Sequence, residues 1–280
     1  MSGSENDPYD TAAQWLREAD GLLVTAGAGM GVDSGLPDFR GKEGFWRAYP
    51  ALQAEGLRFE DIATPAEFRR APLRAWGFYG HRLDLYRKTV PHCGFEILNK
   101  WGDQMEHGAF VFTSNIDGQF EKAGFGDRVV ECHGSIHWLQ CTEQYCQQEV
   151  WSADTVQPKV DVAQCLLLSP LPRCPRCKAI ARPNVLLFDD YHWVEERLSW
   201  QRTWFEGWYS TLRQPVVIEL GAGTAIPSVR RFSERHGPRV IRINPRDSAI
   251  YPHFGIGIAD TALNALERLD TRLGATWSTP

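Results

Sequence analysis

The stretch GLLVTAGAGMG, residues 21–31, decides the fold. Its residues 22–26 form a short apolar run that ends in glycines, which is typical of a buried strand leading into a loop. Continuous apolar strands separated by helices predict an α/β fold, in which a parallel sheet is covered by helices on both faces. Similar apolar runs, separated by helix-like patterns, recur at 109–113, 185–188, 216–220 and 240–243.

The glycines of this stretch make it a candidate phosphate site. Gly27, Gly29 and Gly31 would let backbone amides approach a phosphate, and the N-terminus of a following helix favours negative charge. The spacing does not match the G-x-G-x-x-G dinucleotide fingerprint, because Val32 occupies the third glycine position. A plain turn between a strand and a helix therefore remains the alternative.

Two stretches interrupt the alternation of strands and helices. Residues 42–99 are rich in aromatic side chains and arginine, and residues 136–182 hold four cysteines and several prolines. We expect both stretches to be insertions that together form a small domain. The remaining segments, 1–41, 100–135 and 183–280, would then form the domain that contains the parallel sheet.

Composition argues against several classes of protein. The chain of 280 residues carries a net charge of −5, whereas a broad nucleic-acid surface would show as an excess of basic residues. The first ten residues are polar and acidic, unlike a signal or transit peptide, and no apolar run approaches the roughly 18 residues that a membrane span needs. We therefore expect a cytoplasmic chain whose partners include neither a membrane nor a nucleic acid.

Four of the seven cysteines form two close pairs, Cys141 with Cys146 and Cys174 with Cys177. The odd total in a reducing compartment argues against a disulfide framework. Each pair can place two thiolates on one short turn, and two such turns complete a tetrahedral zinc site. Four sulfur ligands leave no position for water, so we interpret the site as structural. The alternative is four unrelated buried cysteines, and Cys165 is not expected to be a ligand.

Residues 34–41, with the sequence SGLPDFRG, follow shortly after the glycine loop. They place a rigid proline before a carboxylate, an aromatic ring and a guanidinium, which is a rare combination in an ordinary surface loop.

Taken together, the motifs resemble those of the sirtuins, a family of NAD-dependent protein deacylases. The likeness runs from about residue 10 to about residue 267, with the motifs in the family's order. No single motif is specific, whereas the complete set is. The set consists of residues 25–29 (TAGAG), 34–41 (SGLPDFRG), 115–118 (NIDG), 133–135 (HGS), 182–185 (RPNV) and the four paired cysteines.

The resemblance implies a Rossmann-like domain, a small domain made of a zinc ribbon and a helical module, and NAD in the cleft between them. It implies that the glycine loop cradles the pyrophosphate, that Asp117 holds the nicotinamide carboxamide and that Phe39 shields the reactive ribose carbon. Gly221 and Asn244 would face the adenosine half. The NAD-binding set that we expect is Ala26, Gly27, Gly29, Asp38, Phe39, Arg40, Ser114, Asn115, Asp117, Gly221 and Asn244.

By the same resemblance, His133 is the catalytic base, and Asn115 and Asp117 complete the catalytic set. The acyl oxygen of an acylated lysine would capture the ribose carbon as nicotinamide leaves, and His133 would remove a ribose hydroxyl proton. The products would be free lysine, nicotinamide and an O-acyl-ADP-ribose. The His-Gly-Ser sequence alone would favour a structural histidine in a turn. A nucleophilic pair of Cys132 and His133 is disfavoured, because neighbours on an extended chain point to opposite sides.

Substrate binding is expected at two segments. Tyr79 and Arg82 would share one helix face, and similar pairs in some sirtuins read the carboxylate of succinyl- or malonyl-lysine. An aromatic residue packed beside a surface arginine is an equally good interpretation. Val185 and Phe188 would contact the substrate peptide.

A series of tryptophans, Trp200, Trp204 and Trp208, has the spacing of one helix face. A peptide-docking surface is one interpretation. We expect this face to pack in the core.

Several positions depart from the family pattern. Gly31 stands where a serine is usual, Ser114 where a glutamine is usual and Asp189 where a glycine is usual. These changes remove polar contacts near the ribose and phosphates and place a carboxylate beside the peptide, where Asp189 and Asp190 could attract a basic substrate. They leave two other functions open: mono-ADP-ribosyl transfer or NAD hydrolysis, and a sensor of NAD or ADP-ribose without turnover.

Overall fold

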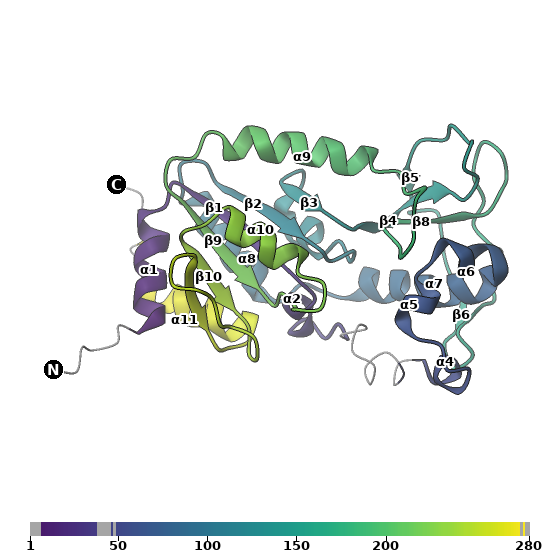
Figure 1. Cartoon of the computed structure of the whole chain (residues 1–280), viewed down its shortest axis with the longest axis horizontal. Coiled ribbons are helices and arrows are strands. Elements are labelled where there is room, and N and C mark those ends of the chain that lie inside the picture. Colours follow the sequence, from purple (N-terminus) through teal and green to yellow (C-terminus); the bar gives the residue numbers. More distant parts are fainter. Residues whose placement is uncertain (1–6, 38–45, 47–48, 275–276, 278–280) are drawn as a thin grey trace.

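A six-stranded parallel sheet forms the larger lobe of the molecule (Figure 1). The computed structural model describes residues 7–37, 46, 49–274 and 277. The strand order is β11-β10-β9-β1-β2-β3, and every neighbouring pair is parallel. The predicted parallel sheet is confirmed. Its strands are β1 (Gly21–Ala26), β2 (Ala109–Thr113), β3 (Val129–Glu131), β9 (Pro215–Leu220), β10 (Val240–Ile243) and β11 (Gly255–Ile258).

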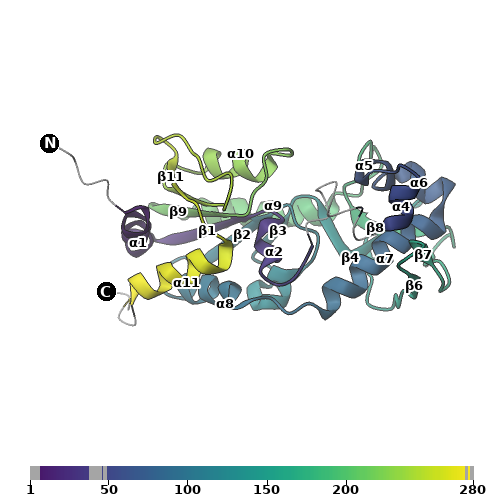
Figure 2. The same ribbon diagram turned by 90° about the horizontal axis from the view of Figure 1, so that it is seen from below.

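Helices cover both faces of this sheet. The first face carries α1 (Pro8–Glu18), α8 (Cys93–Asp103) and α11 (Ala262–Leu273), and the second carries α9 (Glu196–Tyr209) and α10 (Ser228–Arg235). Side chains alternate along β1, so that Leu22 and Val24 join the buried cluster on the first face and Leu23 joins the cluster on the second. Figure 2 shows α10 on one side of the sheet and α8 and α11 on the other. No helix in the described part of the chain combines the length and apolar character that a membrane span requires.

A second, smaller lobe has its own buried core. Its antiparallel sheet has the order β5-β4-β8, and a two-stranded ribbon pairs β6 with β7. The elements of this lobe are α4 (Pro50–Ala54), α5 (Phe59–Ile62), α6 (Pro65–Arg70), α7 (Pro72–Lys88), β4 (Gly134–Cys141), β5 (Trp151–Ser152), β6 (Val160–Asp161), β7 (Leu166–Leu167) and β8 (Ala181–Val185). Two short helical turns, α2 (Gly29–Val32) and η1 (Glu121–Phe125), follow β1 and β2.

Helix α7 connects the parts of the small lobe. The buried Trp76 Nε1 donates a hydrogen bond to the carbonyl oxygen of Ala181 over 2.8 Å. A Cβ at Gly77 would lie 2.1 Å from the carbonyl oxygen of Cys165, and one at Gly80 would lie 2.9 Å from Pro158. Glycine at these positions therefore lets the segment that carries β6 and β7 pack directly on α7.

Two expectations from the sequence are wrong. The apolar run 185–188 is not a strand of the parallel sheet, because β8 ends at Val185 and pairs antiparallel with β4. The run is apolar because it packs against the core of the small lobe. β8 also crosses the boundary expected at residue 183, and the division of the chain into domains stays a prediction.

The second error concerns the tryptophans of α9. The side chains of Trp200 and Trp204 are 61% and 49% exposed, whereas Trp208 packs against Phe110. The buried face of α9 is carried instead by Leu198 and Phe205.

Candidate functional site

The glycine loop after β1 meets the loop after β9 through backbone contacts. Gly27 N donates to the carbonyl oxygen of Leu220 over 3.0 Å, and Gly29 N donates to that of Gly221 over 3.1 Å. A Cβ at Gly29 would lie 2.6 Å from Gly221 Cα, and one at Gly27 would lie 2.8 Å from Ala222 Cα. Glycine is required here because any side chain would separate the two loops.

The loop after β2 is hydrogen-bonded to the end of β1 and to the glycine loop. Ser114 N donates to the carbonyl oxygen of Ala26 over 3.1 Å, and Asn115 Nδ2 donates to that of Gly27 over 3.0 Å. Both side chains are buried. Because the carboxyl ends of parallel strands share one edge, the loops after β1, β2 and β9 form one continuous rim.

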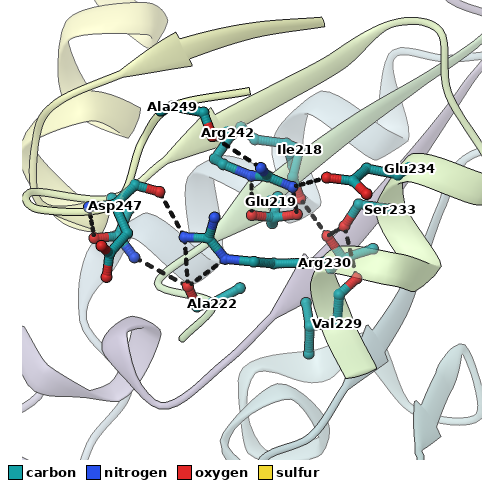
Figure 3. Close-up of polar contacts among 12 residues, drawn as sticks. Ile218, Glu219, Ala222, Val229, Arg230, Ser233, Glu234, Arg242, Asp247 and Ala249 are labelled. Carbon is teal, nitrogen blue, oxygen red and sulfur yellow. Dashed lines mark hydrogen bonds and ion pairs between the residues drawn. The ribbon is translucent and has the colours of Figure 1, made fainter. Parts of the chain in front are cut away.

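The rim extends to Asn244, which follows β10. Asn244 Nδ2 donates to the carbonyl oxygen of Ala222 over 3.1 Å. The guanidinium of Arg230, from α10, donates to the carbonyl oxygens of Ala222 and Asp247, as Figure 3 shows. Arg242, drawn above Arg230 in the same view, bridges Glu219 and Glu234 over 2.6 and 2.8 Å. These contacts hold the loops after β9 and β10 together.

Two adjoining cavities lie along this rim, where it faces the small lobe. The outer cavity, of about 1000 Å³, is lined by Gly27, Gly29, Gly221 and Asn244 among others. The inner cavity, of about 230 Å³, contains His133. Both are lined by Ala28, Leu36, Pro37, Phe59, Ser114, Phe188 and Ile226, so they form one crevice. The predicted residues that line its inner end are Ser114, Asn115, Asp117, His133, Tyr79, Arg82, Val185 and Phe188.

His133 is positioned by a sharp turn between the two sheets. β3 ends at Glu131 and β4 begins at Gly134, whose φ of +72° favours glycine. A Cβ at Gly134 would lie 2.0 Å from the carbonyl oxygen of Asn184, so β8 packs against this turn. Cys132 instead packs in the cluster on the α9 face of the sheet. The structure thus separates the side chain of Cys132 from the cavity that His133 lines.

Asp117 is a buried carboxyl group in the inner cavity. Burial raises its pKa to about 6, although the hydrogen bond from Gln119 N and the charge of Arg82 both act to lower it. His137 Nε2 lies 2.9 Å from the carbonyl oxygen of Asp117, so this histidine supports the loop. The charge of Asp117 can therefore change close to neutral pH.

Arg82 lies beside Asp117 at the end of the crevice that α7 forms. Its Nε and Nη2 donate to the hydroxyl oxygen of Tyr86 over 2.9 and 2.7 Å. Its guanidinium lies 5.1 Å from the ring centroid of Phe78. Tyr79 is buried, and burial raises the pKa of its hydroxyl to about 12, so the hydroxyl stays protonated. These groups present a positive, hydrogen-bonding wall.

Phe188 lines both cavities. Its backbone N donates to the carbonyl oxygen of Ala63 over 2.9 Å, and its ring meets that of Phe59 edge-on at 5.9 Å. The next residue, Asp189, is exposed and has a φ of +54°. Asp190 instead forms a buried ion pair with Arg182 over 2.6 Å, so only Asp189 offers a carboxylate to solvent here.

The four paired cysteines come together in the small lobe. Their sulfur atoms all lie within 4.8 Å of one another, with Sγ–Sγ distances of 3.5 Å between Cys141 and Cys177 and 3.7 Å between Cys146 and Cys174. A tetrahedral zinc ion with Zn–S bonds of about 2.3 Å separates its sulfur ligands by about 3.8 Å. The donor set therefore fits zinc. Cys165 packs against α7 instead.

Sequence reasoning missed part of the crevice. Asp38, Phe39 and Arg40 lie outside the described residues. The cavity residues that were not expected include Leu36, Pro37, Phe59, Tyr86, Leu187 and Ile226. Tyr86 could have been found, because it follows Arg82 by four residues and so shares its helix face.

Comparisons with known proteins agree with this geometry. The family model described as the Sir2 family matches residues 27–201. A deacylase of Aquifex aeolicus, named an NAD-dependent protein deacylase, is 28% identical over 89% of this chain and 93% of its own length. A protein of the same name from Pyrococcus furiosus is 30% identical over 85% of this chain and 86% of its own.

Solved structures agree in fold. The complex of a Sir2 homologue with NAD has a TM-score of 0.72 at 23% identity, and the match covers 99% of this chain and 98% of that one. Another structure, of a Sir2 enzyme, has a TM-score of 0.68 at 25% identity, over 95% and 98%. The family match covers more than half of the chain, and one of these relatives is 30% identical over most of its length. This chain therefore belongs to the Sir2 family.

Proposed function

We propose that this protein is an NAD-dependent protein-lysine deacylase, which releases nicotinamide and an O-acyl-ADP-ribose. The observation that carries the proposal is the single crevice, which runs from Asn244 and the glycine loop at one end to Asp117 and His133 at the other. The relatives named NAD-dependent protein deacylase support it. We place the reaction in the cytoplasm, where thiols stay reduced.

The crevice offers each part of NAD a matching environment. We assign the adenosine half to Gly221 and Asn244, and the pyrophosphate to Gly27 and Gly29, whose backbones leave no room for side chains, together with the preceding Ala26. Asp117 would hold the nicotinamide carboxamide, and Ser114 and Asn115 would lie beside the ribose. Asp38, Phe39 and Arg40 keep the roles that the resemblance implies.

The proposed deacylation reaction needs a general base at the inner end of this crevice. Bound NAD supplies the electrophilic ribose carbon. His133 is the histidine among the described residues that line the inner cavity, and an imidazole can accept a ribose hydroxyl proton near neutral pH. The surrounding side chains, including Phe59, Ile116 and Leu187, are apolar and exclude water from the reaction.

The acyl group that best fits the cavity carries a carboxylate. Arg82 is only 8% exposed, lines the same cavity as His133 and is fixed in place by Tyr86. A buried guanidinium with its fork held rigid is suited to a succinyl or malonyl carboxylate, and Tyr79 would add a hydroxyl. Val185 and Phe188 would flank the lysine side chain.

Zinc has a structural role in this proposal. Cys141, Cys146, Cys174 and Cys177 supply a complete tetrahedral set of thiolates, which leaves no ligand position for substrate. The ion would hold the end of β4 to the loop that precedes β8, and the opposite ends of these two strands pack together next to His133, at Gly134 and Asn184.

A second function on the same fold is ADP-ribosyl transfer or NAD hydrolysis. The exposed carboxylate of Asp189, at the edge where a peptide would lie, favours this alternative. It keeps the NAD site and replaces the acyl-lysine by another acceptor.

One experiment separates these functions. Purified protein is incubated with NAD and with acetyl- or succinyl-lysine peptides, and the products are followed by mass spectrometry. Peptide-dependent release of nicotinamide together with O-acyl-ADP-ribose supports deacylation. A mass gain on protein supports transfer, peptide-independent ADP-ribose supports hydrolysis, and no nicotinamide at all supports a sensor. An Arg82→Met variant should lose any preference for succinyl-lysine while it retains turnover of acetyl-lysine.

A further inference from the structure

A second hollow lies outside the crevice, between α9, β4 and the turn η1. It has a volume of about 530 Å³. Three indole rings line it: Trp138 from β4, and Trp200 and Trp204 from one face of α9. We call these three residues, with the charged side chains around them, the tryptophan pocket. Figure 1 shows α9 running the length of the sheet toward β4 and β5, so the pocket lies where the two lobes meet.

The rings of this pocket are unusually open to solvent. Trp200 is 61% exposed and Trp204 is 49% exposed, although a tryptophan on a helix usually turns its ring inward. A spacing of four residues places both rings one above the other on the helix surface. They form an aromatic wall that nothing else in the described chain covers.

The rim of the pocket is acidic. The carboxylates of Glu121, Asp127, Glu149 and Glu196 line it, against the single guanidinium of Arg197 among the described lining residues. Arg197 is itself engaged, because it pairs with Glu121 over 2.6 Å and also with the buried Glu131. The pocket therefore keeps an excess of negative charge.

Arg197 also shows how a guanidinium fits this environment. Its Cζ lies 4.9 Å from the ring centroid of Trp138, over the aromatic face. A guanidinium over an indole face is a cation–π contact, and a nearby carboxylate strengthens the attraction to a cation. Trp200 and Trp204 add two further indole rings to the same pocket, which the exposed carboxylates of Asp127, Glu149 and Glu196 also line.

We propose that the tryptophan pocket docks a basic segment of a partner protein, with arginine side chains seated on Trp200 and Trp204. Charge complementarity selects this occupant. A second copy of the chain, which carries a net charge of −5, would bring carboxylates against carboxylates across a symmetric contact. Nucleic acids and anionic lipids would be repelled for the same reason.

A binding experiment tests the surface directly. Fluorescence anisotropy measures the affinity of the full chain for a labelled hexa-arginine peptide and for a labelled hexa-glutamate peptide. We expect the hexa-arginine peptide alone to bind, with an affinity that falls as salt is raised. Trp204→Ala should weaken binding about fivefold or more, in line with the loss of a cation–π contact.

A second variant tests the contribution of the acidic side chains separately from that of the tryptophan rings. The double substitution Glu149→Gln and Glu196→Gln changes two exposed side chains, and it should weaken binding of hexa-arginine about as much as Trp204→Ala. Glu206→Gln is the matched control, because Glu206 is exposed on the same helix but does not line the pocket. This control should bind like the wild type.

The outcomes are decisive in either direction. If hexa-arginine does not bind the wild-type chain, or binds the pocket variants and the Glu206→Gln control equally, the proposal is wrong. The measurement needs neither NAD nor turnover, so its failure is separate from a failure of the deacylase proposal. Turnover of a short, uncharged acyl-lysine peptide should be the same in Trp204→Ala and wild type.

Discussion

The two walls of the crevice are built in different ways. The wall formed by the sheet edge is mostly backbone, because Gly27, Gly29 and Gly221 touch without side chains between them. The wall formed by the small lobe is mostly side chains, carried by α5 and α7, in a lobe that also holds four clustered thiols. The shape of a wall made of backbone changes little when side chains are substituted, whereas a wall made of side chains can be altered one residue at a time. We therefore expect the sheet-edge wall to bind the cofactor and the small-lobe wall to determine which acyl group is accepted.

Removal of zinc should have the largest effect on stability, and it should destabilise only the wall that the small lobe forms. Apparent binding energies for structural zinc are about 10 kcal/mol or more, and the strands β5 to β7 are only two residues long, so the ribbon has little else to hold it. A Cys174→Ser variant should lose zinc, measured by elemental analysis, and become sensitive to proteolysis within residues 142–180. Cys93→Ser, which changes an exposed cysteine outside the cluster, is the control. Full protection of Cys174→Ser would mean that the ribbon is stable without metal.

Substitution of His133, the proposed base, should separate NAD binding from the chemical step. His133→Ala should reduce deacylation by about 10²–10⁴-fold, which is the usual contribution of a general base. Binding of NAD, measured by calorimetry, should remain, because the sheet-edge wall is unchanged. The same change at the exposed His253 should have no effect. Turnover by His133→Ala at the wild-type rate would assign the base to another group.

Asp117 should make the protein less stable as the pH rises. Its pKa is raised from 3.8 to about 6 in the folded chain, so the native state binds more protons than the unfolded state between these values. Stability is lost as the pH increases through this window, by about 3 kcal/mol when the carboxyl is fully ionised. In urea titrations, Asp117→Asn should therefore exceed the wild type in stability above pH 6 and equal it near pH 4. A constant difference at every pH would show that the titration of Asp117 is not responsible.

The glycine contacts allow a matched test of the backbone wall. Gly29→Ala introduces a Cβ 2.6 Å from Gly221 Cα, which should force the two loops apart at a cost of about 1–3 kcal/mol and weaken NAD binding. Gly207→Ala adds the same methyl group where nothing lies within 4 Å and lines neither cavity, so NAD affinity should be unchanged. Calorimetric titration with NAD compares the two. Equal affinities would show that the close approach of the loops is not needed.

The smallest expected effect concerns acyl selectivity. Tyr86→Phe removes only the hydroxyl that accepts hydrogen bonds from Nε and Nη2 of Arg82. A net hydrogen-bond contribution of about 1 kcal/mol predicts a change of about fivefold in the ratio of kcat/KM for succinyl- and acetyl-lysine peptides. Tyr251→Phe, at an exposed tyrosine, should leave the ratio unchanged. An equal loss on both peptides would mean that Tyr86 supports the fold rather than selectivity.

The sequence was informative wherever one strong physical signal dominated. The runs around Leu23, Phe110 and Val217 are apolar because both faces of the sheet are buried, and they predicted the parallel sheet. The two cysteine pairs predicted a cluster because thiolates at that spacing converge on one ion.

Other features lacked such a signal. Strand β11 has the sequence GIGI and was missed, because Gly255 and Gly257 lie where a Cβ would come within 1.9 Å of Val240 O and 2.2 Å of Ser248 O. Close packing here requires glycine and removes the apolar pattern. The exposed rings of α9 were misread because helical spacing does not say which face turns inward.

Helix α7 connects the loop between the cysteine pairs to the crevice. One of its faces bears Gly77 and Gly80, on which the loop between the cysteine pairs rests, and another bears Tyr79 and Arg82, which line the crevice. Oxidation of the four cysteines, or loss of their metal, would therefore alter the substrate-binding residues through this one helix of 17 residues. Oxidation of the thiols should reduce acyl-group selectivity before it lowers the affinity for NAD.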